Sequence, residues 1–258
     1  MVVVLLLATA AVALAACGGG TVDTGGGGSS DQPKQGGKLV AAYLTEPSSL
    51  DPAIAYNIID WSVEHEVFAG LMRYAAKPGE AGTQLEPAIA TEVPSVENGG
   101  LSEDGLTYTF HLREDVKFQP PVDRPVTADD FVYSISRLID PKTSPPSPGS
   151  SFYMDIEGAD EFAAGKAKEL SGIKALDPHT LQIKLKSPNL AFLHALTMEF
   201  CDVLAKEWVE KWGKQINRHP LGAGPFMFDH WTPGREIVLK RNPNYWEEGK
   251  PYLDEIEF

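Results

Sequence analysis

Between Lys38 and Phe258 the spacing of apolar residues switches repeatedly between a two-residue repeat and a helical repeat. Tyr108, Phe110 and Leu112 alternate with polar residues, which predicts a half-buried strand. The apolar residues from Phe131 to Ile139 recur at helical spacing, which predicts an amphipathic helix. The two kinds of segment do not alternate as regular strand–helix–strand units. The fold class expected from the pattern is therefore α/β of the mixed α+β kind.

Capping and turn residues indicate where the expected elements begin and end. Thr127 can cap a helix that ends before Asp140-Pro141. Asp177-Pro178 and Thr232-Pro233-Gly234 are turn sequences inside two expected hairpins. The full set of expected elements comprises strands at 38–44 and 108–112, helices at 58–74, 128–139, 155–164, 190–198 and 205–212, and hairpins at 175–186 and 225–241.

Residues 1–16 form an apolar run without a charged side chain. A helix that spans a bilayer needs about 20 residues, so this run matches the apolar part of a secretory signal peptide better. Leu14-Ala15-Ala16-Cys17 resembles the lipobox of bacterial lipoproteins, which implies a signal peptide and lipobox at 1–17 and lipidation of Cys17. The alternative is a simple signal peptide followed by a chance cysteine. No positive charge precedes the apolar run, so we expect a start upstream of Met1 or a clipped N-terminus.

Residues 18–37 are rich in glycine, serine and other polar residues, which cannot bury enough surface to fold. This composition predicts a flexible linker between an anchor and a folded body. A phosphate-binding loop is not indicated, because no lysine follows these glycines at the required spacing and no strand precedes them.

The charge balance and the cysteine count exclude several kinds of partner and site. The formal net charge of −14 argues against nucleic acid and against binding to anionic lipid through a basic patch. If Cys17 is lipidated, Cys201 has no cysteine to pair with, so neither a disulfide framework nor a cysteine zinc cluster is expected. Cys201 lies in an apolar run and is predicted to be a buried small hydrophobe.

Two groups of residues could suggest other chemistry. Asp60, Glu64 and His65 share one expected helix, but their spacing differs from that of a metal-binding HExxH motif, and we interpret them as solvated helix surface. Asp177 and His179 lie in an expected hairpin turn, and no G-x-S-x-G sequence is present. The sequence therefore predicts no catalytic residue, no metal site and no cofactor, and a protein that is not an enzyme.

A series of motifs follows in order along residues 38–258. It consists of SLDP at Ser49, FAGL at Phe68, SEDGLTYTFHLREDVKF at Ser102, PVTADDFVYSISRL at Pro125, KALDPHTLQIKL at Lys174, GAGPFMFDHW at Gly222 and IVLKRNPNYW at Ile237. Together these motifs resemble the extracellular solute-binding proteins of family 5, which deliver peptides, and sometimes nickel or other solutes, to ABC importers. The segment ADEFAAGKAKELSGIKALDPHT is similar to the oligopeptide-binding branch.

The resemblance implies a periplasmic-binding-protein-like type II clamp with two lobes joined by hinge strands. Residues 38–69 and 205–258 would form the hinge-bearing domain of lobe 1, and residues 70–204 would form the domain inserted in it. Related chains continue for about as many residues again and form the second lobe. We therefore expect this sequence to contain the first lobe only.

The resemblance also implies a function and a site. The chain would capture oligopeptides at the outer face of the cytoplasmic membrane, on the cell surface or in the periplasm, and deliver them as a monomer to an ABC permease and its ATPase. The alternatives are binding of nickel or another small solute, and a peptide-sensing surface receptor. Tyr56, Asn57 and Ile58 would meet the ligand through their backbone, and Phe152 and Tyr153 through their rings. Surface or core packing is the competing interpretation for all five. Groups that hold the peptide termini are expected in the second lobe.

Overall fold

The computed structural model describes residues 33–258. Cys17, the predicted signal peptide at 1–17 and most of the predicted linker at 18–37 lie outside the described residues. Residues 34–258 form one compact unit. Within the described part, no helix has the length and apolar character needed to cross a bilayer.

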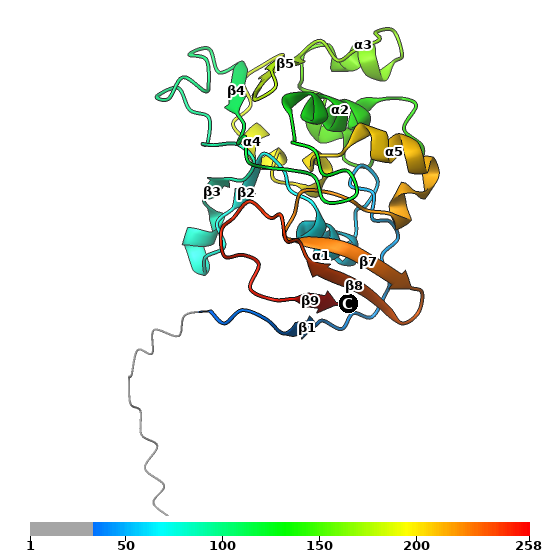
Figure 1. Cartoon of the computed structure of the whole chain (residues 1–258). Coiled ribbons are helices and arrows are strands. Elements are labelled where there is room, and N and C mark those ends of the chain that lie inside the picture. The colour runs from blue at the N-terminus through cyan, green and yellow to red at the C-terminus, as the bar shows by residue number, and fades with distance from the viewer. Residues whose placement is uncertain (1–32) are drawn as a thin grey trace, which may run out of the picture. The chain divides into compact units, whose positions relative to one another are not determined.

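A four-stranded sheet lies at the lower end of this unit in Figure 1. Its strand order is β1 (Lys38–Val40), β9 (Glu255–Glu257), β8 (Glu236–Arg241) and β7 (Phe226–Thr232). β1 runs parallel to β9, and the other neighbours are antiparallel. Helix α1 (Ile58–Val67) packs against β7. The sheet therefore joins the start of the described chain to its far end.

A three-stranded antiparallel sheet lies at the opposite end of the unit (Figure 1). Its order is β4 (Thr107–His111), β6 (Thr180–Lys184) and β5 (Ile173–Asp177), and helix α2 (Ala128–Ile139) packs across β5 and β6. The side chains of Tyr108, Phe110, Leu181 and Ile183 are buried, because alternate residues of each strand turn toward α2.

Short elements connect these two layers. The antiparallel pair β2 (Met72–Tyr74) and β3 (Leu85–Pro87) follows α1. The remaining elements are the short helices α3 (Ala159–Ala163), α4 (Phe192–Ala195) and α5 (Lys206–Trp212), and the 3-10 turns η1 (Gly79–Thr83), η2 (Ser150–Tyr153), η3 (Glu199–Cys201) and η4 (Gly213–Arg218).

Buried apolar side chains gather in two clusters. The first, which we name the α2 core, surrounds α2 and the three-stranded sheet, and its largest fully buried rings are Phe110, Phe118, Phe131, Tyr153, Phe192 and Phe200. The second, the sheet core, lies between α1, α5 and the four-stranded sheet and comprises Leu50, Ile59, Val63, Val67, Phe68, Leu204, Val209, Ile216, Phe226, Ile237, Leu239 and Ile256. The division of the chain into 38–69 with 205–258 and 70–204 stays a prediction.

Several expected elements are present. α2 follows Thr127, and the backbone N–H of Thr127 donates to the Asp130 carboxylate at 2.9 Å, as in a capping box. β5 with β6 and β7 with β8 form the two expected hairpins, and α5 ends at Gly213. Mixed α/β architecture is therefore confirmed.

The helix expected at 58–74 is wrong beyond Val67. Phe68 has extended backbone angles, φ −106° and ψ 176°, and the chain then enters β2. The carbonyl of Val67 accepts hydrogen bonds from the Gly224 N–H at 2.9 Å and from Gln119 Nε2 at 3.0 Å. Distant segments thus bind the helix end, which the local apolar spacing could not reveal. Three other expectations were too long, because the elements at 38–44, 155–164 and 190–198 shorten to β1, α3 and α4.

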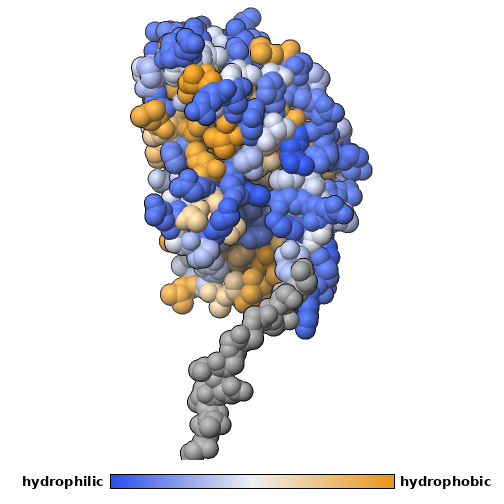
Figure 2. All heavy atoms as spheres, turned by 90° about the vertical axis from the view of Figure 1, so that its left-hand side faces the viewer, coloured by the Kyte–Doolittle hydropathy of each residue, from blue (hydrophilic) through white to orange (hydrophobic). Residues whose placement is uncertain are grey.

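Most of the molecular face that Figure 2 shows carries hydrophilic side chains, and apolar side chains emerge there in separate patches. Across the described residues, the most exposed large apolar side chains are Leu44, Leu190 and Ile58, with Ile58 at 84%. Scattered apolar residues are ordinary on a protein surface. Ile58 differs from the other two because it is the first residue of α1 and directly follows Tyr56 and Asn57.

Candidate functional site

The segment before α1 is held in place by one buried carboxylate, that of Asp60. Its oxygens accept hydrogen bonds from the backbone N–H groups of Ser48 at 2.7 Å, Tyr56 at 3.2 Å and Asn57 at 3.2 Å. The Ser48 hydroxyl donates to it at 2.8 Å. Asp60 is fully buried, so this network fixes the segment that leads to Ile58 although that segment lies at the surface.

Among the backbone groups of residues 56–58, this network leaves two free. The carbonyl of Asn57 accepts the Trp61 N–H at 3.0 Å, and the N–H groups of Tyr56 and Asn57 are taken by Asp60. Within residues 33–258 the Tyr56 carbonyl and the Ile58 N–H find no partner. In extended backbone, a carbonyl and the N–H two residues later point to the same side. They can therefore pair with both backbone groups of one residue in an added strand.

An aromatic surface borders the two free groups. The ring of Tyr56 lies 5.6 Å from that of Trp61 and 5.5 Å from that of Phe200, measured between centroids. Phe152 stacks on Phe200 at 6.4 Å and is 42% exposed, whereas Phe200 is buried beneath the other rings. Segments far apart in the sequence thus combine Tyr56, Trp61, Phe152 and Phe200 into one surface, which we name the aromatic surface.

Gly149 allows this close packing. A Cβ atom at Gly149 would lie 2.5 Å from Cδ2 of Phe200, closer than real contacts allow. The absence of a side chain at this position lets the start of η2 approach the Phe200 ring, which brings Phe152 over it.

The structure groups four of the five predicted ligand residues and separates the fifth. Tyr56, Asn57, Ile58 and Phe152 are exposed, around the aromatic surface. Tyr153 is fully buried, and its hydroxyl donates to the Ala195 carbonyl at 2.8 Å. Its side chain belongs to the α2 core and offers no surface to a ligand in this structure. Packing, the competing interpretation, explains Tyr153.

The prediction of solvated helix surface at Asp60, Glu64 and His65 is wrong for two of the three residues. Asp60 and Glu64 are fully buried, and only His65 is exposed. α1 is covered on more than one side, so polar residues on it do not mark a solvent face. The local pattern also missed Phe200, since only the fold brings it under Tyr56.

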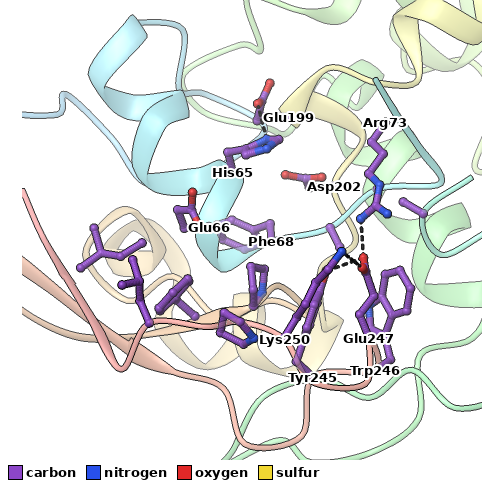
Figure 3. Close-up of a pocket in the computed structure, with 18 of the residues that line it drawn as sticks. His65, Glu66, Phe68, Arg73, Glu199, Asp202, Tyr245, Trp246, Glu247 and Lys250 are labelled. Atoms are coloured by element: carbon purple, nitrogen blue, oxygen red, sulfur yellow. Dashed lines mark hydrogen bonds and ion pairs between the residues drawn. The ribbon is translucent and has the colours of Figure 1, made fainter. Parts of the chain in front are cut away.

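A pocket of about 420 Å³ lies at the opposite end of α1 (Figure 3). The end of α1, β2, the η3 turn and the loop between β8 and β9 line it. Its apolar walls include Phe68, Met72, Phe226, Leu253 and Ile256. We name it the Asp202 pocket, after the buried carboxylate in it.

One end of the Asp202 pocket carries a compensated set of charges. Glu247 accepts hydrogen bonds from Arg73 Nη1 at 2.5 Å, Lys250 Nζ at 2.5 Å and the Tyr245 hydroxyl at 3.1 Å (Figure 3). Burial alone would raise the pKa of Glu247, but the hydrogen bonds from Lys250 and Arg73 hold it at about 2. Glu247 is therefore ionised, and both cations are engaged by it.

The other end of the pocket carries acidic groups. His65 Nδ1 lies 3.5 Å from the Glu199 carboxylate, which raises the pKa of His65. Burial, and then the charge of Glu199, raise the pKa of Asp202 well above its usual value. Glu64 lies behind the pocket wall, and burial followed by the charge of Asp202 raises its pKa as well. Negative charge at this end has less compensation than at the other.

Asp177 and His179, which were considered for catalysis, take part in a hairpin turn. The carboxylate of Asp177 accepts the backbone N–H of His179 at 2.8 Å, which stabilises the hairpin turn. Across residues 33–258, no group of three His, Cys, Asp or Glu side chains is arranged to hold a metal ion. Cys201 is buried, as expected from its apolar neighbours.

Curated relatives of the chain are periplasmic peptide-binding proteins. The chain is 32% identical over 218 residues to the periplasmic oligopeptide-binding protein OppA of Salmonella typhimurium, covering 83% of this chain and 37% of that protein. It is 32% identical over 224 residues to the periplasmic murein peptide-binding protein MppA of Escherichia coli, covering 86% and 39%. The chain thus spans less than half the length of these relatives.

Solved structures of similar fold include the unliganded open form of MppA, a murein tripeptide-binding protein, with a TM-score of 0.74 and 31% identity. OppA of Haemophilus influenzae in complex with the peptide RPPGFSPFR gives a TM-score of 0.75 and 28% identity. The matches cover 88% of this chain and 41% and 42% of those chains. The predicted periplasmic-binding-protein-like fold is therefore confirmed.

A family model described as bacterial extracellular solute-binding proteins, family 5 middle, matches residues 84–258. This match covers β4, α2, both hairpins and the loop that lines the Asp202 pocket. The chain belongs to the bacterial extracellular solute-binding proteins of family 5.

Proposed function

We propose that this chain is the first-lobe part of the substrate-binding component of an ABC importer, which captures oligopeptides outside the cytoplasmic membrane and delivers them to a permease and its ATPase. Relatives named as oligopeptide-binding and murein peptide-binding proteins support peptides as the ligand class. The structure of OppA with a bound nonapeptide supports it further. In this proposal the protein acts as a monomer and is not an enzyme.

The free backbone pair at Tyr56 and Ile58 is the observation that carries the proposal. An extended peptide has unpaired N–H and C=O groups, which are costly to bury without partners. The Tyr56 carbonyl and the Ile58 N–H can bond to one peptide residue as a neighbouring strand does, whatever the side chain of that residue. Recognition through the backbone therefore suits a protein that accepts many peptide sequences.

The aromatic surface would complete this half of the site. Phe152 and Tyr56 present exposed ring faces beside the free backbone pair, on which peptide side chains can pack. In a two-lobed clamp the second lobe closes over the opposite side of the peptide and supplies groups for its charged ends. With this surface alone, we expect the chain to bind peptides weakly. Nanomolar affinity for peptides would contradict the proposal that the second lobe supplies much of the binding site.

We also propose that Cys17 is lipidated and holds the protein at the outer face of the membrane. The lipobox-like sequence supports this, and membership of an extracellular family agrees with it. Residues 18–37 would then serve as the linker. Mass spectrometry of the protein purified from a membrane fraction checks the proposal, because a diacylglyceryl group on Cys17 changes the mass of the N-terminal peptide.

Replacement of Ile58 by proline tests the backbone pair directly. Ile58 is the first residue of α1, a position where proline fits, and the preceding Asn57 has φ −111° and ψ 156°, which proline allows in its predecessor. Ile58→Pro removes the N–H, whereas the matched control Ile58→Ala removes a similar amount of side chain and keeps it. We expect Ile58→Pro to bind short peptides about three- to tenfold more weakly than Ile58→Ala in a nuclear magnetic resonance titration.

Equal peptide affinities of the two variants would overturn the backbone role. Silence with all peptides, together with tight binding of a nickel chelate or another small solute, would overturn the ligand class. Matching circular dichroism spectra of the variants exclude a loss of fold as the cause.

A peptide-sensing surface receptor is a second candidate function. The fold is similar to the pheromone receptor PrgZ, described with its mode of peptide binding, at a TM-score of 0.74 and 27% identity over 87% of this chain. Uptake of a labelled peptide separates the two functions. A transporter component supports import by cells that carry its permease, whereas a receptor changes gene expression without uptake.

A further inference from the structure

We propose that the Asp202 pocket is a second binding site, which takes a primary ammonium group carried on a short aliphatic arm. Neither the family match nor the named relatives assign a ligand to this pocket. The proposal rests on the geometry and charge of the pocket and does not depend on peptide binding at the aromatic surface.

The size and walls of the pocket suit a small, largely apolar ligand. Its volume of about 420 Å³ lies within the range of small-molecule sites, roughly 300–1,000 Å³. Phe68, Phe226 and Ile256 form one apolar wall, and Met72 and Leu253 add to it. An aliphatic arm of a few methylenes gains about 0.8 kcal/mol for each one removed from water.

Asp202 is the group that requires a cation. Its side chain lines the pocket although the residue is only 7% exposed. Within the described part of the chain, no hydrogen bond to its carboxylate offsets the cost of burial. Gly70 leaves room beside it, since a Cβ at that position would lie 3.2 Å from Asp202 Oδ1. A buried carboxylate without a partner is costly, and an ammonium group can donate three hydrogen bonds to such a site.

Neighbouring carboxylates strengthen the preference for a cation. Glu66 and Glu199 line the same end, together with the exposed His65. Figure 3 shows Asp202 between His65 and Arg73, with Glu66 near His65 and Phe68 below Asp202 in this view.

Arg73 and Lys250 are engaged by another carboxylate. Each donates to Glu247 at 2.5 Å, and neither donates a hydrogen bond to Asp202. The pocket therefore keeps an acidic end, apolar walls and a polar end with paired charges. The acidic end suits an ammonium group, and the apolar walls suit the aliphatic arm that carries it.

The chemistry favours an organic cation over a metal ion. No three ligating side chains are arranged for a metal in residues 33–258, and a bare metal ion would gain nothing from apolar walls. A primary amine uses both the carboxylate and the walls. The same chemistry can come from a free alkylamine or from the lysine side chain of a peptide.

The η3 turn separates this pocket from the aromatic surface. Phe200 in η3 packs under Tyr56 and Phe152, whereas Glu199 and the following Asp202 line the pocket. The two sites therefore share one turn of backbone but use different side chains. A variant at one site can be tested without changing the ligand contacts of the other.

Titration of the full chain with n-pentylamine, 1-pentanol and pentanoate tests the proposal. These probes share the five-carbon arm and differ in the charged group. We expect binding of pentylamine only, and a loss of about tenfold or more in Asp202→Asn. Asp229→Asn, in an exposed carboxylate on β7, is the matched control and should bind pentylamine like the parent. Nα-acetyl-lysine amide, which keeps the free ε-ammonium group, serves as a further probe, and its binding extends the ligand to lysine side chains.

Proton release gives a second readout. The titratable and charged groups around Asp202 are Glu64, His65 and Glu66 from α1, Arg73 from β2, Tyr153 from η2, and Glu199 and Cys201 from η3. Burial raises the pKa of Asp202, so an ammonium group that stabilises the ionised carboxylate should release protons as it binds, and the calorimetric enthalpy should depend on the ionisation enthalpy of the buffer. That dependence should vanish in Asp202→Asn.

Pentanol binding as well as pentylamine, no response to either amine at millimolar concentration, or unchanged amine binding in Asp202→Asn would each overturn the proposal. Ile58→Pro should leave amine binding unchanged, so failure of the peptide site and failure of this site are distinguishable.

Discussion

The α2 core and the sheet core differ in how completely the chain closes them. All six of the largest fully buried aromatic side chains belong to the α2 core, and α2 covers its sheet. In the sheet core, β1 is exposed along its whole length, with Leu39 at 48% and Val40 at 62%. The α2 core is thus sealed by its own residues, whereas the four-stranded sheet keeps apolar surface open. Apolar surface that a fold leaves open is available to other segments or partners.

The largest effect is expected inside the α2 core. Phe131 is fully buried, so Phe131→Ala should lower the free energy of unfolding by about 3–5 kcal/mol, through lost burial and the cavity left behind. Urea unfolding followed by tryptophan fluorescence measures this. Val40→Ala, in the exposed strand β1, is the control and should change little. A loss below about 1 kcal/mol for Phe131→Ala would show that the α2 core is not tightly packed.

The next effect concerns an ion pair that connects α2, in the α2 core, with the segment next to Leu50 of the sheet core. Arg137 of α2 donates to both carboxylate oxygens of Asp51 at 2.6 Å, and both residues are largely buried. Asp51→Ala leaves a buried guanidinium unpaired and should cost about 3 kcal/mol. Asp115→Ala, which breaks the exposed pair with Arg113, should cost at most about 1 kcal/mol.

The number of transitions in the unfolding curve shows whether the α2 core and the sheet core unfold together. We expect one transition in the parent, because residues 34–258 form one compact unit. Two separate transitions in the parent would contradict a cooperative unit and would make the two cores independent.

A pH-dependent effect is expected at Glu64, on the helix of the sheet core. Burial and then the charge of Asp202 raise the pKa of Glu64 in the folded state, so the folded state holds a proton on Glu64 more tightly than the unfolded state does. The folded state then binds more protons than the unfolded state, and stability falls as pH rises above about 4.3, at about 1.4 kcal/mol per pH unit. Below that pH both states are protonated, and the full contribution is present.

Glu64→Gln should therefore be more stable than the parent at neutral pH, and this difference should shrink as pH falls toward 4.5. Urea unfolding at several pH values measures it. Glu103→Gln, at an exposed position, should show no such trend. A parent that gains stability relative to Glu64→Gln as pH rises would contradict the burial of a protonated carboxyl group.

The smallest effect is expected on the open side of the sheet core. Leu44 is fully exposed, so Leu44→Ser should change the free energy of unfolding by less than about 0.5 kcal/mol. A loss of unfolding free energy above about 1.5 kcal/mol would mean that another segment covers Leu44. The sheet core would then be less open, and its difference from the α2 core smaller.

The elements that local patterns predicted well are those whose packing partners lie on one side. α2 shows a polar and an apolar face and a capping residue, and the two hairpins show alternation around turn residues. α1 does not divide into one polar and one apolar face, because it packs against the sheet core, the segment around Ser48 and the η3 turn. Its buried carboxylates therefore resembled surface residues in the sequence.

The candidate sites were less predictable than the fold. The motif series suggested Tyr56, Asn57 and Ile58 as ligand residues, which stays a prediction. The role of Asp60 depends on Ser48, twelve residues away, and was not visible in the motifs. The Asp202 pocket combines residues near positions 65–73, 199–202 and 245–256. No local spacing relates these segments, so the pocket becomes visible only when the chain is folded.

The parallel pairing of β1 with β9 joins residues 217 positions apart, since Lys38 pairs with Glu255 (255 − 38 = 217). During synthesis, β1 can pair with β9 only after all the residues between them have been made. Closing so long a loop is entropically unfavourable until most other contacts exist. The strand nearest the N-terminal segment should therefore be the last to gain protection from hydrogen exchange, and its protection would report that the whole sheet has assembled.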